Sequence, residues 1–142
     1  MEYTIQEHSH RFAAWAAARA ASTSSLCRFR VEQGKQILER AMHIQTTGAL
    51  GTLPQADRFD MRHRQWREGA ITVARKQGLP FTHGIAAKLI NVYLKSVYVC
   101  GGLHDDPRVK AIHPPIDSAL LDTLYREDIA GERKAWKEAR DR

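Results

Sequence analysis

Apolar residues recur at helical spacing in four long segments of this 142-residue chain, and no alternating polar and apolar run is long enough to predict a β-strand. A chain with this pattern must bury its apolar stripes by packing helix against helix. Two shorter segments near the carboxyl end also favour helices. The sequence predicts an all-α protein, one domain spanning residues 1–142, with five to six helices at Ile5–Ala21, Val31–Ile44, Asp57–Gln77, Thr82–Cys100, Asp117–Tyr125 and Gly131–Arg140.

The first predicted helix is unusually rich in alanine. Seven alanines lie between Phe12 and Ala21, so neighbouring helices can approach this segment closely. A stripe at spacings of four, three and four also runs along it, through His8, Phe12, Trp15 and Arg19.

The other long helices show expected caps and buried sides. Asp57 and Thr82 are expected to cap the third and fourth helices, because short polar side chains accept hydrogen bonds from the first free amides. Glycines and prolines predict a long loop over Gly101–Pro115. The expected buried positions are Ile37, Leu38, Ala41 and Met42, then Phe59, Trp66, Ala70 and Val73, then Ala86, Ile90, Tyr93, Leu94 and Val97.

Charge and cysteine content narrow the class of protein. The net charge is +6 and the sequence pI about 9.6, which favours polyanionic partners. Two cysteines cannot form a disulfide framework, and no basic-then-apolar signal pattern is seen, so a cytoplasmic location is expected. The most apolar stretch, Gly84–Leu103, is interrupted by Lys88 and Lys95, so no membrane span is predicted.

The third helix concentrates the positive charge. Its stretch from Arg58 to Lys76 holds six basic and two acidic residues, a net +4 of the total +6. Five of the six are arginines, whose planar guanidinium suits bidentate contact with phosphate. This segment predicts contact with a nucleic-acid backbone, and the candidate contacts on it are Arg58, Arg62, Arg64 and Arg67.

The fourth helix and the segment after it contain a possible catalytic pair. Lys88, Asn91 and Lys95 share one face of a helix that is otherwise apolar. Downstream, two prolines precede Asp117, which begins a predicted helix whose free amides can hold its carboxylate. A lysine amine and a fixed carboxylate suit chemistry at a sugar C1′, because the amine can form a Schiff base while the carboxylate stabilises positive charge.

These residues resemble the catalytic stretch of helix-hairpin-helix DNA glycosylases, most nearly the archaeal 8-oxoguanine branch. The resemblance covers Leu79–Leu121: a Leu-Pro turn with Gly84, the lysine helix, and then Pro-Ile-Asp opening a helix. It implies that Lys88 is the Schiff-base lysine, Asp117 the catalytic aspartate and Lys95 an auxiliary basic residue. It also implies DNA as partner, with no cofactor or metal. His83 and Asn91 join the candidate nucleic-acid contacts. The chain has Thr-His-Gly where the family's hairpin has Gly-x-Gly.

Other functions stay open. The spacing Gly-x-Ala-x-Lys-x-x-Asn-x-x-x-Lys followed by His-x-Pro-Ile-Asp resembles uncharacterised bacterial proteins, which would make this chain a non-catalytic binding or adaptor protein for nucleic acid or an acidic partner. A spacing of arginine and histidine with four to six residues between them, typical of helical ribonucleases, occurs twice, as Arg58 to His63 and Arg108 to His113, about as often as chance predicts. The seven histidines show no recognised metal-ligand spacing.

Overall fold

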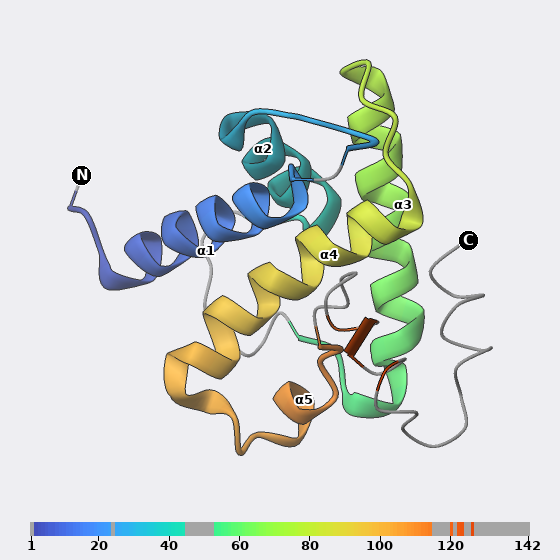
Figure 1. The fold of residues 1–142 in the computed structure, drawn as a ribbon. Coiled ribbons are helices and arrows are strands. Elements are labelled where there is room, and N and C mark those ends of the chain that lie inside the picture. The colour runs from blue at the N-terminus through green and yellow to red at the C-terminus, as the bar shows by residue number, and fades with distance from the viewer. Residues whose placement is uncertain are drawn as a thin grey trace.

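The computed structural model describes residues 2–23, 25–44 and 53–114, together with Leu120, Asp122, Thr123 and Arg126. The described residues form helices and no strand, which confirms the all-α prediction (Figure 1). The elements are α1 (Ile5–Ala21), α2 (Val31–Met42), the 3-10 turn η2 (Ala56–Arg58), α3 (Phe59–Lys76), α4 (His83–Leu94), the π-helix η3 (Lys95–Leu103) and α5 (Pro107–Lys110).

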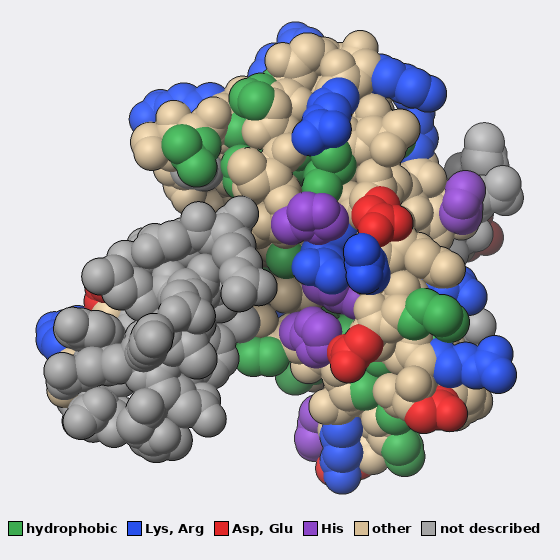
Figure 2. Space-filling view, turned by 90° about the vertical axis from the view of Figure 1, so that its right-hand side faces the viewer, with side chains coloured by type: hydrophobic (Ala, Val, Ile, Leu, Met, Phe, Trp, Pro, Cys, Tyr) green, Lys and Arg blue, Asp and Glu red, His purple; other side chains and the backbone are tan. Residues whose placement is uncertain are grey.

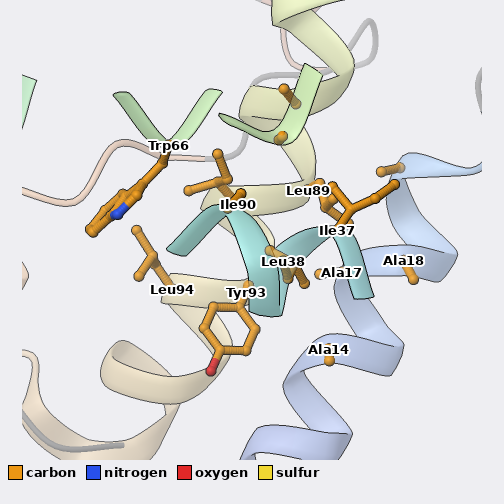
Figure 3. Packing of buried hydrophobic residues seen from close by; sticks show 14 of the residues in the cluster. Ala14, Ala17, Ala18, Ile37, Leu38, Trp66, Leu89, Ile90, Tyr93 and Leu94 are labelled. Atoms are coloured by element: carbon orange, nitrogen blue, oxygen red, sulfur yellow. The ribbon is translucent and has the colours of Figure 1, made fainter. Parts of the chain in front are cut away.

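Helix α4 runs through the middle of the molecule (Figure 1). It packs on α1 along one side and on α3 along another, while α2 packs on both α1 and α3. Its apolar side chains fill the space between these neighbours, with Leu89, Ile90 and Leu94 all at 1% exposure or less (Figure 3). The residues predicted to be buried on this helix are buried, as are Ile37 and Leu38 on α2.

The alanines of α1 allow close helix packing. Ala14, Ala17 and Ala18 are fully buried and point toward the core (Figure 3). Opposite them, Gly34 of α2 lies so near that a Cβ built on it would be 2.6 Å from the Cβ of Ala18. Around Gly34 the two helices therefore approach each other through small side chains and backbone.

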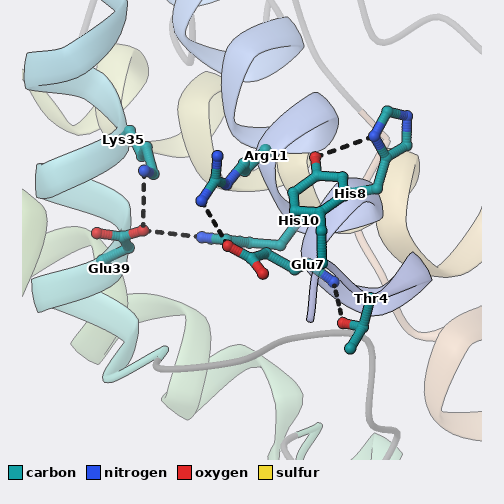
Figure 4. Close-up of polar contacts among 8 residues, drawn as sticks. Thr4, Glu7, His8, His10, Arg11, Lys35 and Glu39 are labelled. Atoms are coloured by element: carbon teal, nitrogen blue, oxygen red, sulfur yellow. Dashed lines mark hydrogen bonds and ion pairs between the residues drawn. The ribbon is translucent and has the colours of Figure 1, made fainter. Parts of the chain in front are cut away.

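A buried polar contact also joins the first, second and fourth helices. His10 of α1 is 5% exposed, and its Nδ1 lies 2.9 Å from the hydroxyl of Tyr93 on α4. Its Nε2 lies 2.8 Å from Glu39 on α2, which also attracts Lys35 at 3.8 Å (Figure 4). Both ring nitrogens are thus satisfied, as a buried imidazole requires.

The helix ends match the prediction in part. Thr82 caps α4, since its side chain accepts the backbone N–H of Ile85 at 3.2 Å. Asp57 does not cap α3; it lies inside η2, and α3 begins at Phe59. The second helix ends at Met42, two residues before the expected Ile44, because His43 adopts a left-handed conformation with φ 54°.

The chain after α4 differs from the prediction. The expected loop from Gly101 is wrong, because helical structure continues as η3 to Leu103 and ends where Gly102 takes φ 85°. A short helix, α5, follows at Pro107. Asp106 caps it by accepting the backbone N–H of Arg108 at 2.8 Å, and this bond lowers the pKa of the Asp106 carboxyl. The predicted helices Asp117–Tyr125 and Gly131–Arg140 lie outside the continuously described residues.

Replacing Gly34 by alanine is expected to lower the free energy of unfolding by about 1–3 kcal/mol. The new methyl group would meet Ala18, whose Cα lies 3.3 Å away and cannot yield without moving α1. The loss would occur although alanine is the better helix former by about 1 kcal/mol. Urea unfolding measures the change, and Gly101→Ala, which faces open space, is the control. A Gly34→Ala protein as stable as the wild type would show that α1 and α2 are not packed this closely.

Candidate nucleic-acid interface

Three segments singled out in the sequence meet at Asn91 of α4. This side chain is 4% exposed, and its Oδ1 accepts a hydrogen bond from Nε2 of His63 on the basic helix α3 at 2.7 Å. Its Nδ2 donates to the backbone carbonyl of Pro114 at 3.5 Å, a long bond. Pro114 begins the proline segment that precedes Asp117. One amide therefore connects the basic helix, the lysine helix and the start of the Pro-Pro-Ile-Asp segment.

The bond to Asn91 also sets the state of the His63 ring. Because an amide oxygen only accepts, Nε2 of His63 carries the proton and Nδ1 has a free lone pair. His63 is 3% exposed, and burial lowers its pKa to about 4. The Asn91 bond works in the opposite direction, while nearby His113 and Arg67 lower the pKa further. The imidazole is consequently neutral at pH 7.

His113 fixes the proline segment to α3. Its Nε2 lies 2.8 Å from Oδ1 of Asp60. Its ring lies over that of His63 with the centroids 4.7 Å apart, and edge-on to Phe59 at 5.1 Å. The segment is therefore attached twice, through His113 to α3 and through Pro114 to α4.

Arg67 forms no ion pair with the described residues of this cluster. It is half-buried, and its Nε is fully shielded from solvent without a hydrogen-bond partner among the described residues. The two acidic residues of α3 are engaged elsewhere, Asp60 with His113 and Glu68 with Arg64 at 3.0 Å. Figure 2, which looks onto α3, shows basic, acidic and histidine side chains gathered at the middle of this face. A buried donor without an acceptor is unfavourable, so Arg67 is suited to receive an anion.

The remaining predicted site residues are more dispersed. Lys88 is half-buried on α4, one turn before Asn91, and Lys95 is exposed at the start of η3. His83 is exposed in the first turn of α4. Arg62 lies about 140° around α3 from Arg67, so the two cannot contact one phosphate. Asp117 lies outside the described residues. The exposed predicted arginines are Arg58, Arg62 and Arg64.

Sequence reasoning missed His63 and His113 as members of the site. Each of them is the histidine of one ribonuclease-type match, with Arg58 and Arg108 as the arginines. The structure brings the two histidine rings together, whereas Arg58 is exposed and Arg108 bonds to Asp106. A signal for His63 was present, because it continues the buried stripe of α3 that starts at Phe59. His113 carried no such signal, since its partner Asp60 is 53 residues away.

Comparisons with known proteins give no relative from which a function could be transferred. No family model, curated protein or solved structure matches the chain. Within the described part of the chain, no helix is long and apolar enough to cross a membrane, and no three histidine, cysteine or acidic side chains gather to hold a metal ion.

The buried neutral ring of His63 predicts a pH-dependent stability. Its pKa is about 4 when folded and about 6.5 when unfolded, so between these values only the unfolded chain binds the proton. Above pH 6.5 neither state binds this proton, and the stability of the folded protein is unaffected by it. As the pH drops from 6.5 toward 4, the free energy of unfolding falls by about 3 kcal/mol at most. Urea unfolding from pH 7 to pH 4 measures this fall.

His63→Gln is the matched variant, because glutamine keeps an N–H donor for Asn91 and does not titrate. It should flatten the dependence between pH 6.5 and 4. An equal slope in both proteins would contradict a neutral, buried His63.

Proposed function

We propose that this protein binds DNA on the face where α3, α4 and residues 113–114 meet, and that Lys88 forms a Schiff base with a sugar C1′ there. The observation that carries the proposal is the pair of hydrogen bonds made by Asn91, which joins His63 of the basic helix to Pro114 of the segment leading to Asp117. This contact supports the spatial relation that the resemblance to helix-hairpin-helix glycosylases requires.

Phosphate binding is assigned to Arg67 with exposed arginines around it. Arg67 has no acceptor for its buried Nε among the described residues, and the neutral ring of His63 beside it adds no competing positive charge. A phosphate would bind the solvent-accessible part of this half-buried side chain. Asn91 does not contact DNA in this scheme, because its amide is buried and engaged; it positions the segment.

The reaction is assigned to Lys88 and Asp117. The amine of Lys88 adds to the C1′ aldehyde of an abasic sugar, and water leaves to give an imine. Asp117 stabilises the positive charge on that imine. Asp117 lies three residues after Pro114, a chain length that spans at most about 11 Å. The proposal therefore requires that residues 115–117 direct the Asp117 carboxylate back toward α4.

DNA binding is expected to weaken about 10- to 150-fold in Arg67→Gln, since a hydrogen bond to a charged group contributes about 1.5–3 kcal/mol. The slope of log affinity against log salt should fall by about one. Fluorescence anisotropy of a labelled duplex at several salt concentrations measures both. Arg75→Gln removes the same charge from an exposed position in the last turn of α3 and serves as the control. Equal losses in both variants would mean that Arg67 makes no specific phosphate contact.

Borohydride reduction in the presence of an abasic duplex is expected to crosslink the protein to DNA. Reduction converts the imine into a stable amine, so the adduct survives denaturing electrophoresis. Lys88→Arg keeps the charge but cannot form the imine, and should abolish the crosslink while DNA binding remains. Lys95→Arg should retain it, and Asp117→Asn should slow its formation without weakening binding.

The same assay separates the alternatives. DNA binding with no adduct from any abasic or damaged duplex would favour a non-catalytic binding protein. Loss of the adduct in Lys95→Arg instead of Lys88→Arg would move the nucleophile to the next lysine. Cleavage of RNA but not of its deoxy counterpart would assign the chemistry to the adjacent rings of His63 and His113.

A further inference from the structure

Helix α1 has a second apolar face that points away from the core. Its outer stripe runs through Ile5, His8, Phe12, Trp15 and Arg19, at spacings of three, four, three and four, and every member is exposed. Ile5 is 75% exposed, Phe12 59% and Trp15 50%. The inner face is formed by the buried alanines and His10. An exposed stripe with this alternating spacing has the pattern of a two-helix seam.

We propose that α1 pairs with α1 of a second copy of this chain, antiparallel and around a two-fold axis near Phe12. The rings of Phe12 and Trp15 are 5.9 Å apart and form one aromatic ridge. Two such ridges brought together by a two-fold axis would pack against each other at the centre of the interface. This dimer does not depend on the proposed DNA chemistry.

The apolar area is close to what a specific dimer needs. Tyr3, at 53% exposure, extends the stripe beyond Ile5. With side chains of about 150–250 Å² each, these two together with Phe12 and Trp15 leave on the order of 400–500 Å² in water. Pairing two copies would remove about twice that area, near the lower limit of ~1,000 Å² for specific interfaces.

The charges along α1 favour a second copy in the antiparallel orientation. The amino-terminal end carries Glu2 and Glu7, of which Glu7 is ion-paired with Arg11 of the same helix, and the carboxyl-terminal end of the stripe carries Arg19. Antiparallel pairing places Arg19 of each copy near the acidic end of its partner, whereas parallel pairing would place the two Arg19 side chains together. The antiparallel orientation therefore brings Arg19 toward Glu2 of the partner subunit, whereas the parallel orientation brings like charges together.

The dimer would leave the candidate DNA face accessible. In Figure 1, α1 and α3 lie on opposite sides of the molecule, with α4 between them. Pairing through the outer face of α1 thus directs the two basic helices outward, one on each side of the dimer axis. Two linked DNA-binding faces would act with increased effective concentration on one duplex.

Sedimentation velocity over about 1–500 µM tests the pairing. The wild type should change from 16.1 kDa monomer to a dimer of twice that mass. Phe12→Glu combined with Trp15→Glu should raise the dimer dissociation constant at least tenfold, with an unchanged circular dichroism spectrum, because both side chains are exposed in the single chain. Met61→Glu, a change at another exposed apolar side chain outside the stripe, should leave association unchanged. A wild type that stays monomeric throughout would overturn the proposal.

Disulfide exchange tests the orientation. In a Cys100→Ser background, a mixture of Ile5→Cys and Arg19→Cys proteins should form mixed disulfides, because the antiparallel seam brings these positions together. Each protein alone should form few. Disulfides between identical variants would overturn the antiparallel arrangement. A monomer whose Trp15 fluorescence is quenched by single-stranded DNA would overturn the dimer and identify the aromatic ridge as a base-stacking surface.

Discussion

The amide of Asn91 is the contact on which the arrangement of the candidate site depends. Burying an amide without partners costs about 1–3 kcal/mol, so its position inside an apolar helix is stable only when both of its ends are bonded. The Oδ1 end is satisfied by His63 of α3 and the Nδ2 end by the carbonyl of Pro114. These two bonds fix how α3 and the proline segment sit against α4. Burial of this polar group therefore favours the register in which the basic helix and the lysine helix meet at His63 and Asn91.

Helix α4 also bonds a second buried histidine, His10, through Tyr93. The hydrogen-bond networks around His10 and His63 differ in how their charges are balanced. Tyr93 bonds His10, whose other nitrogen faces the carboxylate of Glu39. That network contains its own negative charge and joins three helices. Around His63 the nearest carboxylate, Asp60, is engaged by His113, and Arg67 has a buried donor without an acceptor among the described residues. The first network is complete, whereas the second leaves one buried donor unsatisfied among the described residues.

Local rules account for most of the helices and their buried sides. High alanine content predicted α1, apolar spacing predicted the core positions of α4, and the Thr82 hydroxyl made the α4 cap recognisable. The same rules predicted helix as far as Cys100 but missed both the change of helix type after Leu94 and its continuation to Leu103, because π-helical hydrogen bonding has no apolar period of its own. Ser96, which bonds the Val92 carbonyl at 2.8 Å, marks this change only once the backbone is known.

The site was less predictable than the fold, because its contacts join residues far apart in sequence. Lys88, Asn91 and Arg67 were found from helix faces and charge, but the pairing of His63 with Asn91 spans 28 residues and that of His113 with Asp60 spans 53. No local pattern encodes which polar residues of two helices will meet. The sequence does contain two polar residues at positions where apolar residues are expected: His63 on the buried stripe of α3 and Asn91 on the apolar helix α4. Each would be unfavourable alone, and each is stabilised by the other, so two polar residues on apolar faces are a reason to expect that those faces pack together.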